Sequence, residues 1–301
     1  MTAVDGSFAQ PTPDQQPDIA LDRNVSARGA LIVIERSCIE YLKANEAALQ
    51  QTRAPEALHQ MRVALRRWRT ALAVLGEVAT PEDKAAGGEL KWMAGELDEA
   101  RDLDVFAESR AVQKSKDPSQ ATGTAAFGRA LAQARTRAYK RAAEAIASER
   151  WRRFLWDAGK RASAPAWIDD EGPSARRLAT AALARRAKRV KSGGRRLRKL
   201  EPEARHRLRI EAKKARYTAE LFEDLFGRAR RRRRFVDVLR KLQGALGDLN
   251  DIHVGRGLAE RFSKGGERAV VAGADDAKRS AQLLRKAAKA HEQFLDLKRF
   301  W

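Results

Sequence analysis

The segment at residues 59–69, HQMRVALRRWR, recurs at residues 206–216 as HRLRIEAKKAR. Both copies begin with His, place Arg between two apolar residues, and end with a basic pair, one further residue and a basic residue. A second pair of segments, ELDEARDLDV at 96–105 and ALGDLNDIHV at 245–254, lies at an offset of 149 residues, close to the 147 between His59 and His206. Two matches at nearly the same offset indicate an internal duplication.

Helix-favouring residues surround these segments and predict an all-α fold. Ala, Leu, Arg, Glu and Lys dominate the chain, while hairpin signals are nearly absent. Proline, glycine and short polar runs divide the chain into eight predicted helices. Their ranges are 24–50, 56–76, 82–113, 125–161, 174–191, 203–226, 231–262 and 268–299.

Four of the predicted helices lie on each side of the acidic, proline-containing segment 165–173. We therefore predict one domain over residues 23–301, with a first four-helix repeat at 24–163 and a second at 174–300. Residues 1–22 contain Pro11, Pro13 and Pro17 among polar residues, which is typical of a disordered tail.

The composition indicates an anionic partner. The 301 residues include 61 Lys and Arg against 40 Asp and Glu, which gives a formal net charge of +21 and a pI near 10.7. A single cysteine, Cys38, lies in an apolar helical pattern and is expected to be a core residue. The sequence shows no signal peptide and no segment long enough to cross a membrane, so we expect a cytoplasmic protein.

The repeated segment forms one basic stripe per copy. At about 100° per residue, the basic residues lie within roughly 80° of one another on each helix. The predicted stripes consist of His59, Arg62, Arg66 and Arg69 in the first copy, and His206, Arg209, Lys213 and Arg216 in the second. Apolar residues flank each stripe on both sides, which favours a partly enclosed row of cations over a solvated face. Because the arginine fork matches phosphate oxygens, we expect a ligand that carries many phosphates.

The two segments resemble the signature motifs of the CHAD family, the conserved histidine α-helical domain. The resemblance rests on HQMRV at 59–63, HRLRI at 206–210, RDLDV at 101–105 and LND at 249–251, and it covers nearly everything from residue 24 to the end. It implies two four-helix bundles related by a pseudo-twofold axis, with a basic central channel or cleft. It also implies binding of inorganic polyphosphate and association with polyphosphate granules, or with polyhydroxyalkanoate granules.

Carried over by position, the eight stripe residues would contact polyphosphate. The second tier of candidates is weaker: Arg67 and Lys214 match the family pattern but point away from the stripe, and the others rest on spacing in the preceding helix. The second tier comprises Arg36, Lys43, Arg67, Arg185, Arg189 and Lys214. We expect no metal, cofactor or catalysis, because neither a nucleophile beside a base nor a magnesium-binding set of carboxylates is evident.

Two alternatives stay open. Net charge alone would suit a nucleic-acid-binding protein without sequence preference, and the arginine run at 230–234 would suit the same ligand or a solvated first turn. A scaffold on polyhydroxyalkanoate granules is the other.

Asp98, Asp102 and Asp104 could be metal ligands, but Asp102 and its counterpart Asp251 are better explained as partners that orient basic side chains, because the repeat replaces the other two by Gly247 and His253.

Overall fold

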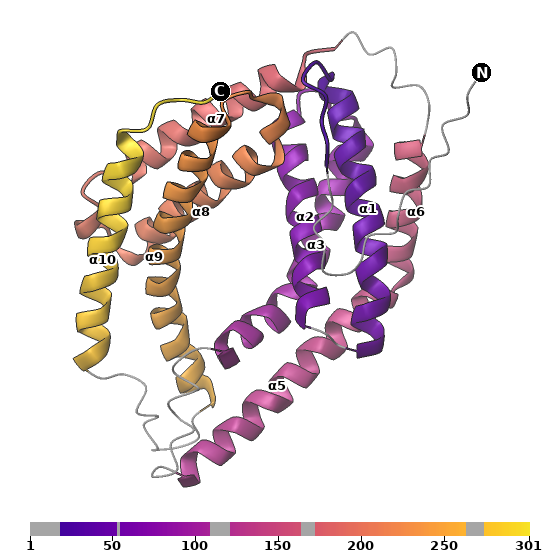
Figure 1. The fold of residues 1–301 in the computed structure, drawn as a ribbon. Helices are drawn as coiled ribbons and strands as arrows, with labels where there is room; N and C mark the ends of the chain where they lie inside the picture. The colour runs from indigo at the N-terminus through magenta and orange to yellow at the C-terminus, as the bar shows by residue number, and fades with distance from the viewer. Residues whose placement is uncertain (1–18, 53–54, 109–120, 164–171, 263–273) are drawn as a thin grey trace.

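The computed structural model describes residues 19–52, 55–108, 121–163, 172–262 and 274–301, and the regular structure in these residues is helical (Figure 1). The all-α prediction is confirmed. The helices are α1 (Ala27–Thr52), α2 (Pro55–Leu75), α3 (Pro81–Glu108), α5 (Ala121–Ala147), α6 (Glu149–Ser163), α7 (Ala175–Gly193), α8 (Pro202–Leu221), α9 (Ala229–Phe262) and α10 (Ala274–Leu295), with short 3-10 turns η2 (Leu197–Lys199) and η3 (Glu223–Leu225).

Local sequence signals explain where the helices begin. Proline is the first residue of α2, α3 and α8, a position where its missing N–H leaves no hydrogen bond unmade. Ser174 caps α7, and its hydroxyl accepts a bond of 3.2 Å from the N–H of Arg177. These signals also explain why most predicted starts agree with the structure to within a few residues. The predicted start at 268 lies outside the described residues, and the last helix ends at Leu295 rather than at 299.

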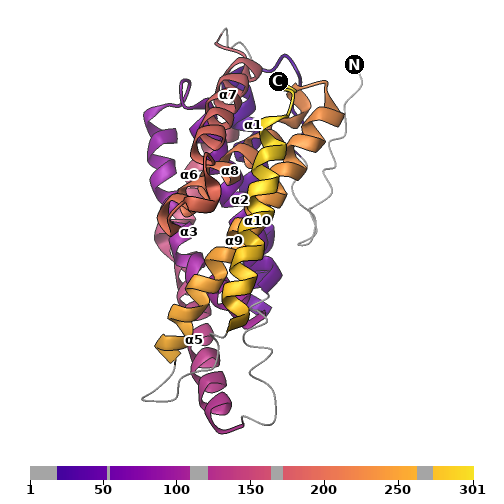
Figure 2. The ribbon, with the colours of Figure 1, turned by 90° about the vertical axis from the view of Figure 1, so that its left-hand side faces the viewer.

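The two halves of the chain pack their helices in the same order. In the first half α1 packs on α2, α2 on α3 and α3 on α5, and in the second half α7 packs on α8, α8 on α9 and α9 on α10. The halves lie on opposite sides of the molecule in Figure 1, and the view turned by 90° shows an elongated body (Figure 2). Helices α2 and α8, which carry the two copies of the repeated segment, contact each other across the boundary.

The single helix predicted over 125–161 is wrong, because the chain bends at Ser148 and forms α5 and α6. The Ser148 hydroxyl donates to the carbonyl of Ala145 at 2.6 Å and accepts from the N–H of Trp151 at 3.2 Å. Ser148 thus ends one helix and caps the next. The first half therefore has five described helices, and α6 packs against α1.

The starts of α1 and α7 are joined by reciprocal backbone hydrogen bonds. The N–H of Ala27 donates to the carbonyl of Pro173 at 2.8 Å, and the N–H of Ala175 donates to the carbonyl of Val25 at 3.0 Å. Between them Ser26 and Ser174 form an isolated antiparallel bridge. The partners are 148 residues apart, and their exchange reproduces the same bonds, as a twofold relation requires. The bridge joins the two halves at the starts of α1 and α7.

The predicted tail extends too far, because its last residues belong to the packed structure. Leu21 is buried, and its N–H donates to the Asp224 carboxylate in η3 at 3.3 Å, while Ile19 packs against the core. Burying these two side chains favours an ordered start that reaches across to the second half. Residues 1–18 of the expected tail lie outside the described residues.

Aromatic side chains fill the core of each half. Trp68 of α2 stacks on Phe154 of α6 with ring centroids 5.5 Å apart. Phe235 of α9 contacts Phe300 near the C-terminus, also with centroids 5.4 Å apart. Cys38 is fully buried, as expected, and burial raises the pKa of its thiol to about 12. Among the described helices, none combines the length and the apolar character that crossing a bilayer requires.

Candidate anion-binding site

Helices α2 and α8 meet through their basic stripes, at Tyr217. The Arg66 guanidinium of α2 lies over the Tyr217 ring of α8, 4.1 Å from its centroid, and Arg216 lies 4.4 Å from the same centroid. A cation over an aromatic face is attracted by the ring's quadrupole. Tyr217 therefore holds one arginine from each half beside the boundary.

Four arginines of the two stripes act on the ionisation of Lys213. Loss of water lowers the pKa of Lys213 to about 8, and the next largest contributions come from Arg209, Arg66, Arg62 and Arg216 in that order. Two of these arginines are on α2 and two are on α8. We call these five residues, Arg62, Arg66, Arg209, Lys213 and Arg216, the basic cluster. Such a concentration of like charge opposes the ionised state of its own members.

In the first half, the cluster residue Arg62 already has a carboxylate partner. Its Nη1 donates to Oδ1 of Asp98 in α3, which is a close ion pair, and lies 3.5 Å from the Ala94 carbonyl oxygen. Arg101 lies beside this pair, and after desolvation its charge contributes most to the lowered pKa of His59. His59 is therefore biased towards the neutral form in the free protein.

In the second half, the equivalent Arg209 lies against glycine. A Cβ atom placed on Gly247 of α9 would be 3.4 Å from both Nε and Nη2 of Arg209. The Nε of Arg209 is buried and has no hydrogen-bond partner in the described part of the chain. A buried donor without a partner is costly, so Arg209 has an unmet hydrogen-bond requirement, whereas Arg62 is paired with Asp98.

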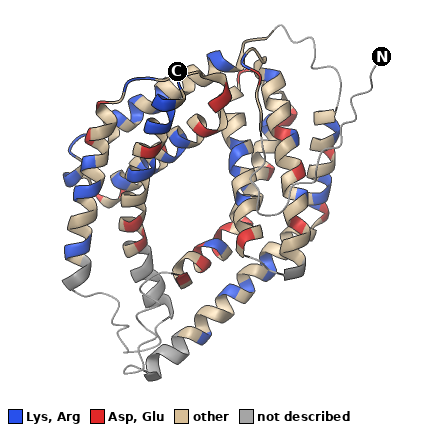
Figure 3. Cartoon of the chain, in the orientation of Figure 1, with Lys and Arg blue, Asp and Glu red and all other residues tan. Residues whose placement is uncertain are grey.

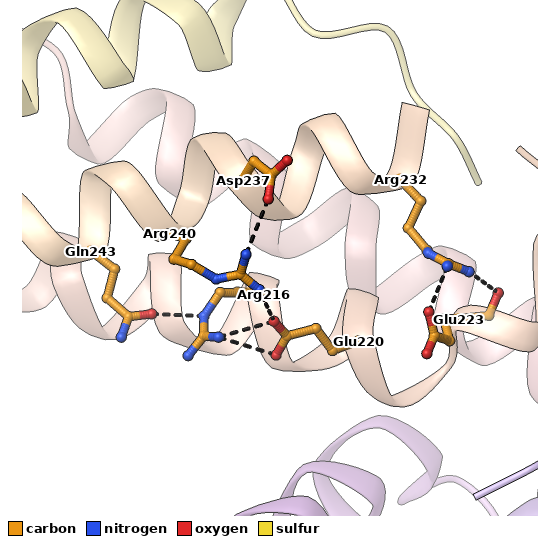
Figure 4. Close-up of polar contacts among 7 residues, drawn as sticks. All are labelled: Arg216, Glu220, Glu223, Arg232, Asp237, Arg240 and Gln243. Carbon is orange, nitrogen blue, oxygen red and sulfur yellow. Dashed lines mark hydrogen bonds and ion pairs between the residues drawn. The ribbon is translucent and has the colours of Figure 1, made fainter. Parts of the chain in front are cut away.

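Arg216 is held by a polar network on α8 and α9 (Figure 4). Its Nε donates to Oε1 of Gln243 at 2.9 Å, and its Nη1 donates to the Glu220 carboxylate at 2.9 and 3.3 Å. Arg240 also donates to Glu220, at 3.3 Å. Among the cluster residues in the described part of the chain, Arg216 thus makes the most side-chain hydrogen bonds within its own half.

The remaining predicted residues lie at or beyond the edge of the basic cluster. His206 and Arg69 are exposed at their places in the two stripes. Arg36 donates to the Ala162 carbonyl of α6 at 2.7 Å, and Arg67 lies close enough to Cys38 of α1 to act on its thiol. The structure therefore does not bring Arg36 and Arg67 into the cluster.

The other second-tier residues are on exposed faces. Lys43 is exposed on α1. Lys214 and Arg189 both pair with Glu211, at 3.1 and 3.7 Å. Arg185 is exposed on α7, where it lines a separate hollow beside the C-terminal residues. Lys214 and Arg189 thus lie beside α8 on Glu211, whereas Lys43 and Arg185 lie on other exposed surfaces.

Three residues near the site were not predicted as part of it. Asp98, rather than Asp102, pairs with Arg62, although Asp102 contributes to its ionisation at longer range. Tyr217 was predicted only as an apolar flank. Arg186 of α7 donates to the Lys214 carbonyl at 2.7 Å and to the Thr218 hydroxyl, and so fixes α8. In the sequence, only the four-residue spacing between Asp98 and Asp102, which puts both on one face of the helix, pointed to Asp98.

The acidic motif of α3 is structural at its centre. Asp104 is fully buried and accepts from Nε and Nη2 of Arg135 at 3.0 and 2.6 Å, and from the Tyr139 hydroxyl at 2.6 Å. The motif thus fastens α3 to α5. In the equivalent region of α9, loss of water raises the pKa of Asp251, and the charge of Asp102 adds to this rise. This region of α9 therefore faces the first half. In the described residues, no three His, Cys, Asp or Glu side chains are grouped as metal ligands.

A second basic surface surrounds the start of α9. A hollow of about 660 Å³ is lined there by Arg230, Arg233, Arg234, Lys241 and residues of lower charge. Arg232 is excluded from it by an ion pair with Glu223 at 2.6 Å. Figure 3 shows Lys and Arg distributed over α7, α9 and α10 as well as α8. The second half is therefore basic on its outer faces too.

Comparison with known proteins places these features in a family. The model of the CHAD domain family matches residues 34–260. The crystal structure of the CHAD domain from the plant Ricinus communis resembles the chain with a TM-score of 0.74 and 25% identity, covering 94% of this chain and 97% of that one. PptA from Streptomyces chartreusis resembles its fold with a TM-score of 0.62 and 18% identity, covering 89% and 97%. No curated protein matches the sequence.

Proposed function

The chain belongs to the CHAD domain family, and from this membership and the basic cluster we propose that it binds inorganic polyphosphate without hydrolysing it. The observation that carries the proposal is the convergence of four arginines from two halves on Lys213. Like charges held so close destabilise the free protein, and a polyanion between them would relieve the repulsion.

Phosphate chemistry suits the donors that the cluster presents. Arg62, Arg66 and Arg209 offer planar forks that bind phosphate oxygens in pairs, and Lys213 adds a compact charge. Polyphosphate repeats one anionic group along a flexible chain, so successive groups can reach cations on both α2 and α8. Binding requires only these cations and donors, whereas hydrolysis would require an activated nucleophile as well.

Charge reversal tests the site. We expect the double variant Arg62→Glu, Arg209→Glu to bind long-chain polyphosphate at least about 100-fold more weakly, because two charge-assisted contacts are replaced by repulsion. The double variant Arg152→Glu, Arg153→Glu is the control for net charge, since both residues are on α6 with side chains 68% and 80% exposed. Isothermal titration calorimetry at fixed salt measures both, and equal losses in the cluster and control variants would contradict the site.

Salt dependence separates polyanion binding from other modes. Neutralising phosphates releases counterions, so the logarithm of the affinity should fall linearly with the logarithm of the salt concentration. The slope should be smaller in the cluster variant than in wild type. Orthophosphate release from polyphosphate by the pure protein would show that binding is not its whole activity.

The second basic surface favours one competing function, sequence-independent binding of nucleic acid. The arginines at the start of α9 are exposed and could contact a phosphate backbone of any kind. Competition decides between the two ligands. If duplex DNA displaces long polyphosphate at equal phosphate concentration and moderate salt, nucleic acid is the better ligand.

We further propose that polyphosphate binding targets the protein to storage granules. Imaging a tagged protein in cells with and without polyphosphate tests this part. The Arg62→Glu, Arg209→Glu variant should be diffuse in both. Recruitment to polyhydroxyalkanoate granules in cells that lack polyphosphate would favour the scaffold instead.

A further inference from the structure

The two halves of the site differ at one pair of equivalent positions, Asp98 on α3 and Gly247 on α9. The offset of 149 residues that aligns the two acidic motifs places Gly247 where the first half has Asp98. The cluster arginines Arg62 and Arg209 are equivalent by the offset of 147. Each arginine lies against the helix that carries its half's acidic motif, as the Asp98 ion pair and the Gly247 contact show.

The difference between Asp98 and Gly247 determines which existing contact each arginine loses when it binds an anion. Arg62 donates to the Asp98 carboxylate, which a phosphate oxygen would have to replace. Arg209 has a buried Nε with no partner in the described residues, and its neighbour Gly247 has no side chain to supply one. An anion at Arg209 therefore displaces no hydrogen-bonded carboxylate, whereas at Arg62 it has to displace Asp98.

Total charge does not account for this difference. The first half also carries Arg101 where the second has Asn250, so the first half is not short of cations. What differs is that the central arginine of the first half is already hydrogen-bonded. The Asp98 side chain is about half exposed, so it can swing away into water without being stranded in the core.

We propose that Arg209 is the anchor of the site and that Asp98 is an internal competitor which occupies Arg62 until a phosphate chain displaces it. This inference rests on the proposed function and assigns its two halves different tasks. Asp98 lowers the affinity of the first half, so it reduces the extra binding that a chain long enough to reach α2 gains over a short chain held on α8. It is a specificity-determining residue for chain length.

Removing the competitor tests the proposal from one side. Asp98→Asn should bind long-chain polyphosphate about threefold to tenfold more tightly than wild type, with a smaller gain for tripolyphosphate, because only a chain that reaches α2 has to displace the partly exposed ion pair. Asp157→Asn on α6 is the control, since it removes one negative charge from an exposed i,i+4 pair away from the cluster. If Asp98→Asn binds no more tightly than Asp157→Asn, the competitor role is wrong.

Installing a competitor tests it from the other side. Gly247→Asp places a carboxylate beside Arg209 and should weaken binding of both ligands about tenfold, whereas the neutral Gly247→Asn, which has the same shape, should weaken binding much less. Equal losses in these two variants would overturn the anchor role. Asp98→Asn adds no atoms to the core and decides the matter if the Gly247 variants do not fold. Failure of wild type to bind long polyphosphate would instead refute the proposed function itself.

Discussion

Lys213 should make polyphosphate binding depend on pH in the alkaline range. Its pKa of about 8 means that the free protein loses this charge as pH rises through 8, because the site is desolvated and rich in arginine. A bound polyanion favours the charged form and raises the pKa, so above pH 8 binding takes up a proton and affinity falls, by at most about tenfold per pH unit. Lys213→Arg stays charged and should flatten this decline between about pH 8 and 10.

The matched control for this experiment is Lys214→Arg, on the exposed side of the same helix. Its affinity should follow the wild-type pH profile. Calorimetry in two buffers of different ionisation enthalpy would measure the proton uptake directly. A Lys213→Arg profile as steep as that of wild type would show that another group titrates.

Glu35 should make folding stability fall as pH rises from about 4.5 to 7. Burial raises the pKa of Glu35 to about 7, against the opposing charge of Arg161 at 3.6 Å. An unfolded glutamate titrates near 4.3, so in this interval the folded state binds a proton that the unfolded state does not. The resulting loss is at most about 3 kcal/mol by pH 8. Glu35→Gln cannot ionise and should remove it.

Urea unfolding at pH 5 and pH 8 checks this prediction, because the difference between variant and wild type isolates one group from the others that titrate. Glu40→Gln, on an exposed position of α1, is the control and should change neither value by more than about 0.5 kcal/mol. The same pH dependence in wild type and Glu35→Gln would contradict the assignment.

At the scale of single residues, the sequence predicted most of the basic cluster and missed its partners. The helical wheel places a side chain on a face of its own helix, so it found Arg62, Arg66, Arg209, Lys213 and Arg216. It cannot tell which carboxylate of a neighbouring helix will meet that face. Asp102 was therefore predicted as the orienting partner, whereas the packing of α2 against α3 brings Asp98 to Arg62.

Among the elements, the contact of α3 with α5 should depend strongly on Asp104. Its carboxylate accepts three hydrogen bonds from two α5 residues, Arg135 and Tyr139, in a buried position. We expect Asp104→Asn to lower the free energy of unfolding by about 2 to 4 kcal/mol, because it removes the charge that satisfies Arg135. Asp102→Asn, in the exposed part of the same motif, should cost less than about 0.5 kcal/mol. Urea unfolding at neutral pH measures both, and equal effects would contradict this role.

Helix positions were largely predictable, because most boundaries are made by proline or glycine. The exception at Ser148 has neither residue, and the alanine-rich sequence before it continues a helical pattern without interruption. The break depends on a hydroxyl that bonds to the backbone on both sides, to Ala145 and to Trp151. Leu21 was missed for a related reason, since one apolar residue beside a helix start has no periodicity to reveal it.

At the scale of the whole molecule, the bridge between α1 and α7 should contribute to the stability of the assembled halves. Ala175→Pro removes the N–H that donates to Val25, and its ring would meet that carbonyl. Proline is tolerated at the first position of a helix, so α7 itself should persist. We expect a loss of about 1 to 3 kcal/mol in urea unfolding.

Ala229→Pro is the matched control, because it makes the same substitution at the first position of α9, which is not part of the bridge. Its stability should stay within about 1 kcal/mol of wild type. If both variants lose the same amount, the bridge adds nothing to the association of the halves.

The reciprocal bonds around Ser26 and Ser174 also bear on the direction in which a bound polymer lies. A linear polyphosphate is the same from either end. The two backbone hydrogen bonds around Ser26 and Ser174 are likewise equivalent when the two halves are exchanged. A strand of DNA or RNA has distinct 5′ and 3′ ends, so it would meet the two halves in opposite senses. Under the proposed function, this relation suits a polymer without polarity, and the unequal pair Asp98 and Gly247 would give the site a preferred end.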